Sequence, residues 1–134
     1  DHNDLHPWNV FASRNCDGSD AMFYDWGDSV VSHPFASLIV PMRFLRQELQ
    51  AGEGDPRVER VRSAYLSAFA DLAPPAELLQ QAELACKVGL AARCLTWQRA
   101  VQALPSAESE VARAPYETLA QLVDGQSQAF LLHI

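Results

Sequence analysis

The chain has 134 residues, and about half of them are hydrophobic, which is enough for one domain with an apolar core. Its formal net charge of -7 argues against a nucleic-acid partner, because phosphate backbones attract basic surfaces, and no continuous apolar stretch is long enough for a membrane partner or span. The cysteines Cys16, Cys86 and Cys94 are odd in number and lack metal-ligand spacing, so we expect reduced thiols in a cytoplasmic protein.

Acidic residues are concentrated at the start of the chain. Residues 1–28 contain six Asp and one Arg, whereas residues 29–134 contain eleven acidic and nine basic residues. Because carboxylates attract cations, this first stretch is suited to a divalent metal, and it would also favour a cationic acceptor substrate.

The first predicted element is a β-hairpin. Val10–Arg14 and Ala21–Asp25 have strand-like content, and the stretch Cys16–Asp20 between them is a turn signal. Such a hairpin would bring Asn9 and Asp25 to the same end, as a shared metal ion requires.

Helices are predicted to follow. Residues 35–49 carry apolar side chains at helical spacing, although Pro41 is expected to kink or divide that helix. Asp55-Pro56 is typical of a helix start, with Asp as the cap. The apolar stripe of this second helix extends to Leu72.

Two more helical regions complete the chain. One covers residues 75–104 with an interruption near Gly89, and the last covers residues 108–132. We therefore expect one domain, mainly α with a small β-hairpin. The last region places four apolar side chains roughly on one face, Tyr116, Leu119, Val123 and Phe130.

Two short motifs carry the residues suited to chemistry. The first reads H-N-D-L-H-P-W-N at residues 2–9, and the second reads D-W-G-D at residues 25–28. A kinase catalytic loop has an Asp base and, five positions later, an Asn that binds magnesium, while a second metal-binding Asp lies on a separate turn. Asp4, Asn9 and Asp25 have that order and spacing.

Each of these residue types suits one step of phosphoryl transfer. Magnesium is a hard cation that requires oxygen ligands, which Asn9 and Asp25 can supply. The attacking hydroxyl needs a carboxylate to orient it and to take its proton, and Asp4 is the candidate. His6 lies two residues further on, where it can contact the phosphate or brace the loop.

Residues 2–38 resemble the aminoglycoside phosphotransferase and choline kinase-like superfamily, whose motifs read H-G-D-L-H-P-G-N and D-W-x-D. The resemblance implies the C-terminal lobe of a protein kinase-like fold. It makes Asp4 the catalytic base and Asn9 and Asp25 the magnesium ligands, with His6 and Asp28 in support. Asp28 is either a further metal ligand or the cap of the next turn.

The chain departs from the family pattern at three positions. Asn3 and Trp8 stand where the family usually has glycine, which leaves the chemistry intact. Ser37 stands where an Asp frequently follows a His-Pro turn such as His33-Pro34, and this position bears on how the catalytic loop is braced. Trp8, like Trp26, is expected to be a packing residue.

The resemblance also implies how the chain is organised. Residues 1–33 would hold the catalytic and metal loops with the hairpin, and residues 34–134 would form a helical subdomain. Lys87 is the only Lys and no Gly-rich phosphate loop is present, so we expect the N-terminal lobe that grips the nucleotide to be absent from this stretch. The implied enzyme moves the terminal phosphate of ATP or GTP to the hydroxyl of a small molecule with Mg²⁺, and this segment alone is expected to be inactive.

Two other interpretations stay open. The first is a noncatalytic helical binding or regulatory module that keeps the motif as a relic. The second is a metal-dependent hydrolase, because Asp1, His2, Asp4 and His6 place four potential ligands within six residues. A zinc site would need further ligands at supporting spacing, and His2 is expected to brace the loop instead.

Overall fold

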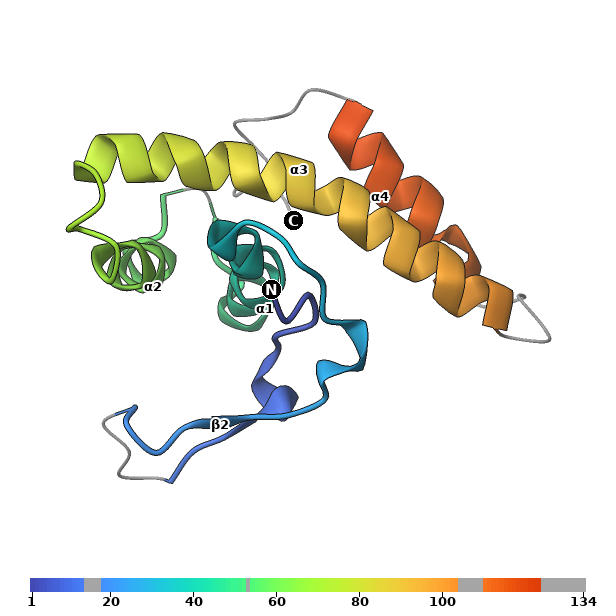
Figure 1. Ribbon diagram of the computed structural model, residues 1–134, viewed down its shortest axis with the longest axis horizontal. Helices are drawn as coiled ribbons and strands as arrows, with labels where there is room; N and C mark the ends of the chain where they lie inside the picture. The colour runs from blue at the N-terminus through green and yellow to red at the C-terminus, as the bar shows by residue number, and fades with distance from the viewer. Residues whose placement is uncertain (14–17, 53, 104–109, 124–134) are drawn as a thin grey trace.

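The structure is a computed structural model that describes residues 1–13, 18–52, 54–103 and 110–123. This part of the chain is mainly helical, with four α-helices and one two-stranded antiparallel sheet. The longest helix, α3, has α1 and α2 on one side and α4 along its C-terminal half (Figure 1). None of these helices has both the length and the apolarity that a membrane crossing requires. The α-helices are α1 (Ile39–Leu49), α2 (Pro56–Ser67), α3 (Pro75–Ala103) and α4 (Ala114–Val123).

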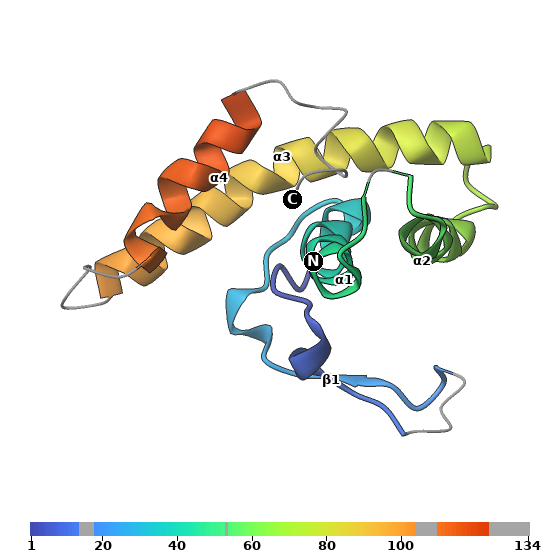
Figure 2. The same cartoon turned by 180° about the vertical axis from the view of Figure 1, so that it is seen from behind.

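The predicted hairpin is present and stands away from the helices (Figures 1 and 2). Its strands β1 (Val10–Phe11) and β2 (Met22–Phe23) are antiparallel, with Val10 opposite Phe23. Both strands are two residues long and thus shorter than the sequence predicted, and residues 14–17 of the predicted hairpin lie outside the described part.

The chain enters α1 through a 3₁₀ helix, η3 (Pro34–Leu38). The change from 3₁₀ to α-helix at Ile39 divides the predicted 35–49 helix. Pro41 itself lies in the first turn of α1, where its missing N–H has no partner within an α-helix to lose. The division therefore occurs two residues before the proline that led us to expect it.

Asp55 begins α2 as the sequence predicted. Its carboxylate accepts a hydrogen bond from the backbone N–H of Arg57 at 2.9 Å, which satisfies one of the free N–H groups of the first turn. The helix ends at Ser67, and the remainder of the predicted stripe, up to Leu72, lies in turns.

The helix α3 is continuous, so the interruption predicted near Gly89 is wrong. A Cβ atom added to Gly89 would come within 2.8 Å of Cδ1 of Ile39 and 2.9 Å of Cβ of Ala36. The missing side chain lets α3 lie close against η3 and the start of α1. This close approach explains a residue that otherwise lowers helix stability.

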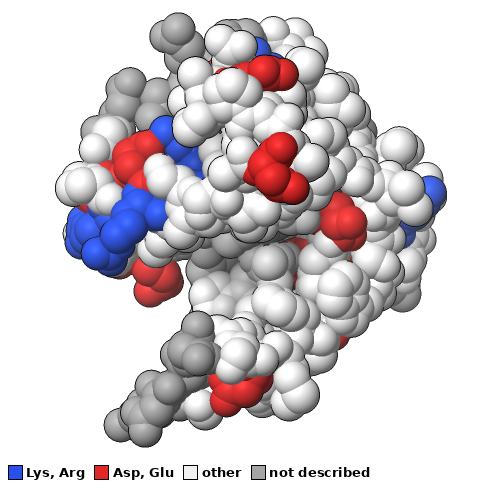
Figure 3. Space-filling view, turned by 60° about the vertical axis from the view of Figure 1, so that its left-hand side comes forward, with Lys and Arg blue, Asp and Glu red and all other residues white. Residues whose placement is uncertain are grey.

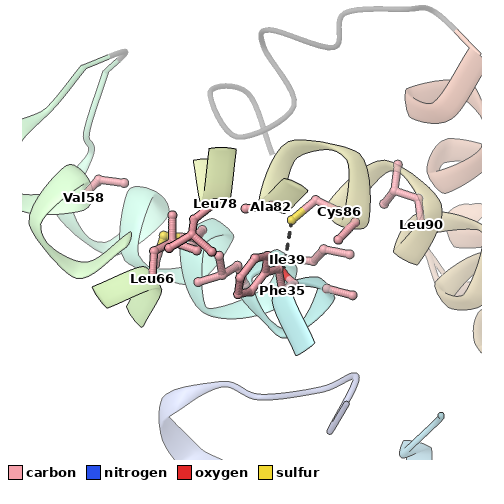
Figure 4. Close-up of a cluster of buried hydrophobic side chains, with 12 residues drawn as sticks. Phe35, Ile39, Val58, Leu66, Leu78, Ala82, Cys86 and Leu90 are labelled. Atoms are coloured by element: carbon pink, nitrogen blue, oxygen red, sulfur yellow. Dashed lines mark hydrogen bonds between the residues drawn. The ribbon is translucent and has the colours of Figure 1, made fainter. Parts of the chain in front are cut away.

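The hydrophobic core lies where η3, α1, α2 and α3 meet (Figure 4). Phe35 is 2% exposed, packs edge-on against Phe69, and its carbonyl accepts a hydrogen bond from the Cys86 thiol at 3.5 Å. Burial raises the pKa of Cys86 to about 12, so this free thiol stays protonated. Cys94 is also free, as expected, and Cys16 lies outside the described residues. The other members of the core are Ala36, Leu38, Ile39, Met42, Val58, Leu66, Leu78, Ala82, Ala85 and Leu90.

The last described helix, α4, follows a short 3₁₀ helix, η4 (Glu110–Arg113). Its apolar residues Tyr116, Leu119 and Val123 are exposed, whereas Thr118 is buried. The face predicted from the sequence is therefore a solvent-facing one, and Phe130 lies outside the described part.

Charged side chains are unevenly distributed on the face shown in Figure 3. The largest group of Lys and Arg lies at the left edge, with smaller basic patches at the top and at the right edge, whereas Asp and Glu are scattered over the surface. A hollow separates the projecting hairpin from the helical body in the same view. On this face the acidic excess of the chain does not form one continuous patch.

Candidate functional site

The first motif folds into a tight loop that the Asn9 side chain holds together. Asn9 is buried, and its Nδ2 donates a hydrogen bond to the carbonyl of Asp4 at 3.0 Å. The same nitrogen lies 3.2 Å from Nε2 of His6, which in turn lies 3.4 Å from a carboxylate oxygen of Asp4. The structure thus brings together Asp4, His6 and Asn9, three of the five predicted site residues.

These contacts leave the Asn9 side-chain oxygen available. A backbone carbonyl can only accept, so Nδ2 of Asn9 must be the atom that faces the carbonyl of Asp4. Its second hydrogen is directed at His6. No hydrogen-bond donor approaches Oδ1 of Asn9 within the described ranges, and an amide oxygen is a ligand that magnesium accepts.

Asp25 lies at the same end of the hairpin as Asn9, as predicted. The backbone N–H of Tyr24 donates to the carbonyl of Asn9 at 3.2 Å, which extends the strand pairing to the residue before Asp25. Asp25 has φ of 61° and ψ of 61°, a left-handed conformation that Asp tolerates better than most residues. Its carboxylate is exposed and makes no hydrogen bond or ion pair with other described residues, so it is free to bind a cation.

The ligand set of the hydrolase interpretation does not assemble. Among the described residues, no group of three or more His, Cys, Asp or Glu side chains is arranged to hold a metal ion. Buried His2 donates through Nε2 to the carbonyl of Tyr24 at 2.8 Å and packs against Trp26, so it braces the loop. A kinase magnesium site requires fewer protein ligands, since phosphate oxygens and water complete it.

Asp28 joins the site through a different set of contacts. Its backbone carbonyl accepts a hydrogen bond from Nδ2 of Asn3 at 3.2 Å. Asp28 also borders a cavity of about 70 Å³ together with Asp4 and Arg93. Burial lowers the pKa of Arg93, and the charges of Asp4 and Asp28 oppose that shift. Asp28 is therefore connected to Asp4 by way of a half-buried cation.

Asn3 and Arg93 are parts of the site that the sequence analysis missed. The φ of Asn3 is 63°, in the left-handed region where glycine is the default and Asn is tolerated, which explains the departure from the family glycine. Its Nδ2 donates to Thr96 at 3.0 Å, and its carbonyl accepts a hydrogen bond from the Arg93 guanidinium. Helix α3 thereby holds the loop that carries Asp4.

Ser37 supplies a brace from the position where the family frequently has Asp. Its Oγ donates to a carboxylate oxygen of Asp1 at 2.8 Å, and the same oxygen accepts the backbone N–H of Asn3 at 2.9 Å. The brace thus reaches the residue next to Asp4.

The two tryptophans of the motifs are not core residues. Trp8 is 66% exposed and Trp26 is 54% exposed, so the packing predicted for them is against residues of the loop, such as His6 and His2, and not in the core. The Trp8 ring meets the edge of Phe44 with ring centres 5.0 Å apart, and it also lies 5.5 Å from the ring of His6. These rings cover the loop from its solvent side.

A cavity of about 230 Å³ opens beside Asp4 and His6. Helices α1, α3 and α4 line the rest of it, with Arg43 from α1 and Arg93 and Trp97 from α3. A small molecule in this cavity would lie next to the candidate base. The sequence offered no signal for it, because its lining comes from three separate helices.

Comparison of the chain with models of known protein families, with curated proteins and with solved structures finds no match in any of the three. The family resemblance therefore rests on the residues of the two motifs alone.

Proposed function

We propose that this chain is the C-terminal lobe of a small-molecule kinase with a protein kinase-like fold, which transfers the terminal phosphate of ATP or GTP to a hydroxyl group. The observation that carries the proposal is the loop of the first motif. Asn9 fixes the backbone of Asp4, keeps its own Oδ1 free, and leaves the Asp4 carboxylate beside a cavity. In a kinase the base and the metal ligand act on the same phosphate, so the loop must hold the Asp4 carboxylate and the Asn9 side-chain oxygen in fixed positions near the bound substrate.

Asp4 is the candidate catalytic base. A hydroxyl group bound in the cavity would donate a hydrogen bond to the Asp4 carboxylate, which orients the oxygen and accepts its proton as transfer proceeds. His6 lies 3.4 Å from that carboxylate and 3.2 Å from Asn9, so it positions the two residues relative to each other. We also propose that His6 contacts the transferred phosphate.

Asn9 and Asp25 fit a magnesium ion. Both present oxygen atoms that no described residue engages, and both lie at one end of the hairpin. Magnesium bound there would neutralise charge on the transferring phosphate. We propose Asp28 as a further ligand of the metal ion. We also propose a cytoplasmic location, where thiols are reduced and nucleoside triphosphates are available.

The metal assignment can be tested on the chain itself without nucleotide. Mn²⁺, which shares the preference of Mg²⁺ for oxygen ligands, is titrated into isotope-labelled protein while NMR line broadening is followed. We expect the Asn9 side-chain amide and the backbone of residues 24–26 to broaden first. The variant Asp25→Ala should weaken this binding about tenfold, because a charged ligand is lost.

The matched control is Asp71→Ala, which removes an exposed acid that makes no hydrogen bond or ion pair with other described residues. It should leave the broadening unchanged. Broadening that begins elsewhere, or that is the same in Asp25→Ala as in the unmodified chain, would remove Asp25 and Asn9 from the metal site.

A further inference from the structure

We propose that the acceptor substrate carries a carboxylate, which Arg43 binds in the cavity between α1, α3 and α4 while the acceptor hydroxyl faces Asp4. The inference rests on the proposed kinase function and names the substrate class of the same site. It reverses the expectation of a cationic acceptor, which was drawn from the acid-rich first 28 residues.

The positive charge of the cavity lining supports an anionic acceptor. Arg43 and Arg93 line the cavity, and among the described lining residues Asp4 is the one carboxylate. A cationic group would therefore meet two guanidinium groups, whereas an anion would be attracted to them.

Arg43 has its hydrogen-bond donors available. It lies on α1, its side chain is exposed, and it makes no hydrogen bond or ion pair with other described residues. A guanidinium group presents several N–H donors in a planar fork that matches the two oxygens of a carboxylate. Arg43 is thus suited to bind an acceptor carboxylate in a bidentate manner.

Arg93 adds positive charge to the cavity, but its guanidinium group is already engaged in a hydrogen bond. Its guanidinium donates to the carbonyl of Asn3 and thereby positions the catalytic loop. Burial is the main cause that lowers the pKa of Arg93, and the charge of Arg43 lowers it further. The two like charges therefore influence each other, and an anion bound beside them would relieve their repulsion.

The remaining walls define the body of the acceptor. Phe44 and Trp97 line the cavity together with the aliphatic side chains of Ile39 and Leu90. The volume of about 230 Å³ lies below the range typical of drug-sized ligands. The acceptor is therefore a compact molecule with an apolar, preferably flat, body between its hydroxyl and its carboxylate.

Three compounds that share a para-hydroxymethyl phenyl body and carry an anionic, a neutral or a cationic group test this inference on the chain alone. They are para-hydroxymethyl benzoate, the neutral para-hydroxymethyl benzamide and the cationic para-hydroxymethyl benzylamine. Binding is measured by calorimetry and by NMR shifts of the Trp97 indole, without magnesium or nucleotide. We expect the benzoate to bind about tenfold more tightly than the benzamide, and the benzylamine to bind most weakly.

The variant Arg43→Gln should weaken benzoate binding about tenfold and leave benzamide binding unchanged. Arg60→Gln is the matched control, because Arg60 is also an exposed helix residue but belongs to α2 and does not line the cavity. The inference is overturned if the benzylamine binds best, if Arg43→Gln binds the benzoate normally, or if none of the three compounds binds.

Failure of the anion preference and failure of the kinase proposal give different results. Tight, Arg43-dependent binding of the benzoate supports the anion preference even if the natural protein transfers no phosphate. A natural protein that phosphorylates hydroxyl compounds but prefers cationic acceptors would keep the kinase and overturn the anion preference.

Discussion

The region from residue 34 onward and the region of residues 1–33 are stabilised by different interactions. In the helical region, apolar side chains are buried between helices, as with Phe35 at 2% exposure. In the first region, the large apolar side chains are exposed, as with Phe11 at 60%, and side chains such as Asn3 and Asn9 hold the chain through hydrogen bonds. The scaffold thus depends on burial, whereas the site depends on directional polar contacts.

The difference bears on how the site tolerates change. Apolar burial contributes to global stability, whereas hydrogen bonds of a surface loop mainly determine local geometry. We therefore expect core substitutions to unfold the protein and site substitutions to loosen the loop without unfolding the helices.

A pair of Phe→Ala variants tests the contrast directly. Phe35→Ala should lower the free energy of unfolding by about 3 to 5 kcal/mol, because it empties a filled core position. Phe11→Ala should change it by less than about 0.5 kcal/mol, because that ring lies on the exposed hairpin. Denaturant unfolding of both variants measures the two values, and similar losses would show that the hairpin shares the core.

Variants of Asn3 separate backbone conformation from hydrogen bonding. Asn3→Gly keeps the left-handed conformation but loses the contacts to Asp28 and Thr96, at a cost of about 1 to 3 kcal/mol within the loop. Asn3→Ala should cost about 1 kcal/mol more, because alanine is strained at this φ.

Hydrogen exchange of residues 2–11 is the measurement for Asn3, with Thr96→Ala as the control that removes one of the two Asn3 contacts, together with the hydrogen bond from Thr96 to the carbonyl of Ala92. Faster exchange in the loop with unchanged exchange in α3 is expected. Loss of protection in both regions at once would show that the loop and the scaffold unfold as one unit.

The cap of α2 should give the smallest effect, and it depends on pH. Hydrogen bonds from the side chain and backbone of Arg57 lower the pKa of Asp55 from 3.8 to about 2. Because the folded-state pKa is the lower one, the stabilisation is fully present above about pH 4 and is lost as the pH falls toward 2.

Asp55→Asn should therefore flatten the fall in stability between pH 4 and pH 2, by a small amount because its partner Arg57 is exposed. Unfolding midpoints at several pH values measure it, with Asp71→Asn as the control. An identical pH profile for Asp55→Asn and the unmodified chain would mean that the cap contributes nothing measurable.

Local sequence signals predicted the local structure well. Asp55-Pro56 located the start of α2, and the turn signal between two strand-like stretches located the hairpin and placed Asn9 and Asp25 at one end. These features depend on residues close together in the chain. The spacing of Asp4 and Asn9 likewise corresponds to a hydrogen bond within one loop.

Contacts between distant residues were not predictable from these signals. Arg93 reaches Asn3 across 90 residues without any motif. The sequence predicts a helix interruption near Gly89 because glycine weakens helices. The prediction is wrong because the close approach to Ile39 and Ala36, which requires glycine, exists only once the helices pack. Single-sequence patterns give the local propensity of a segment, whereas the cavity beside Asp4 is a product of helix packing.

The most direct test of the kinase proposal is the turnover rate of the Asp4→Asn variant in the two-lobed enzyme that the proposal implies. The substitution keeps size and hydrogen-bonding reach but removes the base, so turnover should fall by roughly a hundredfold to ten-thousandfold. Nucleotide affinity should stay the same, with circular dichroism confirming the fold. Normal turnover would remove Asp4 from catalysis, and a loss explained entirely by weaker nucleotide binding would contradict its role as the base.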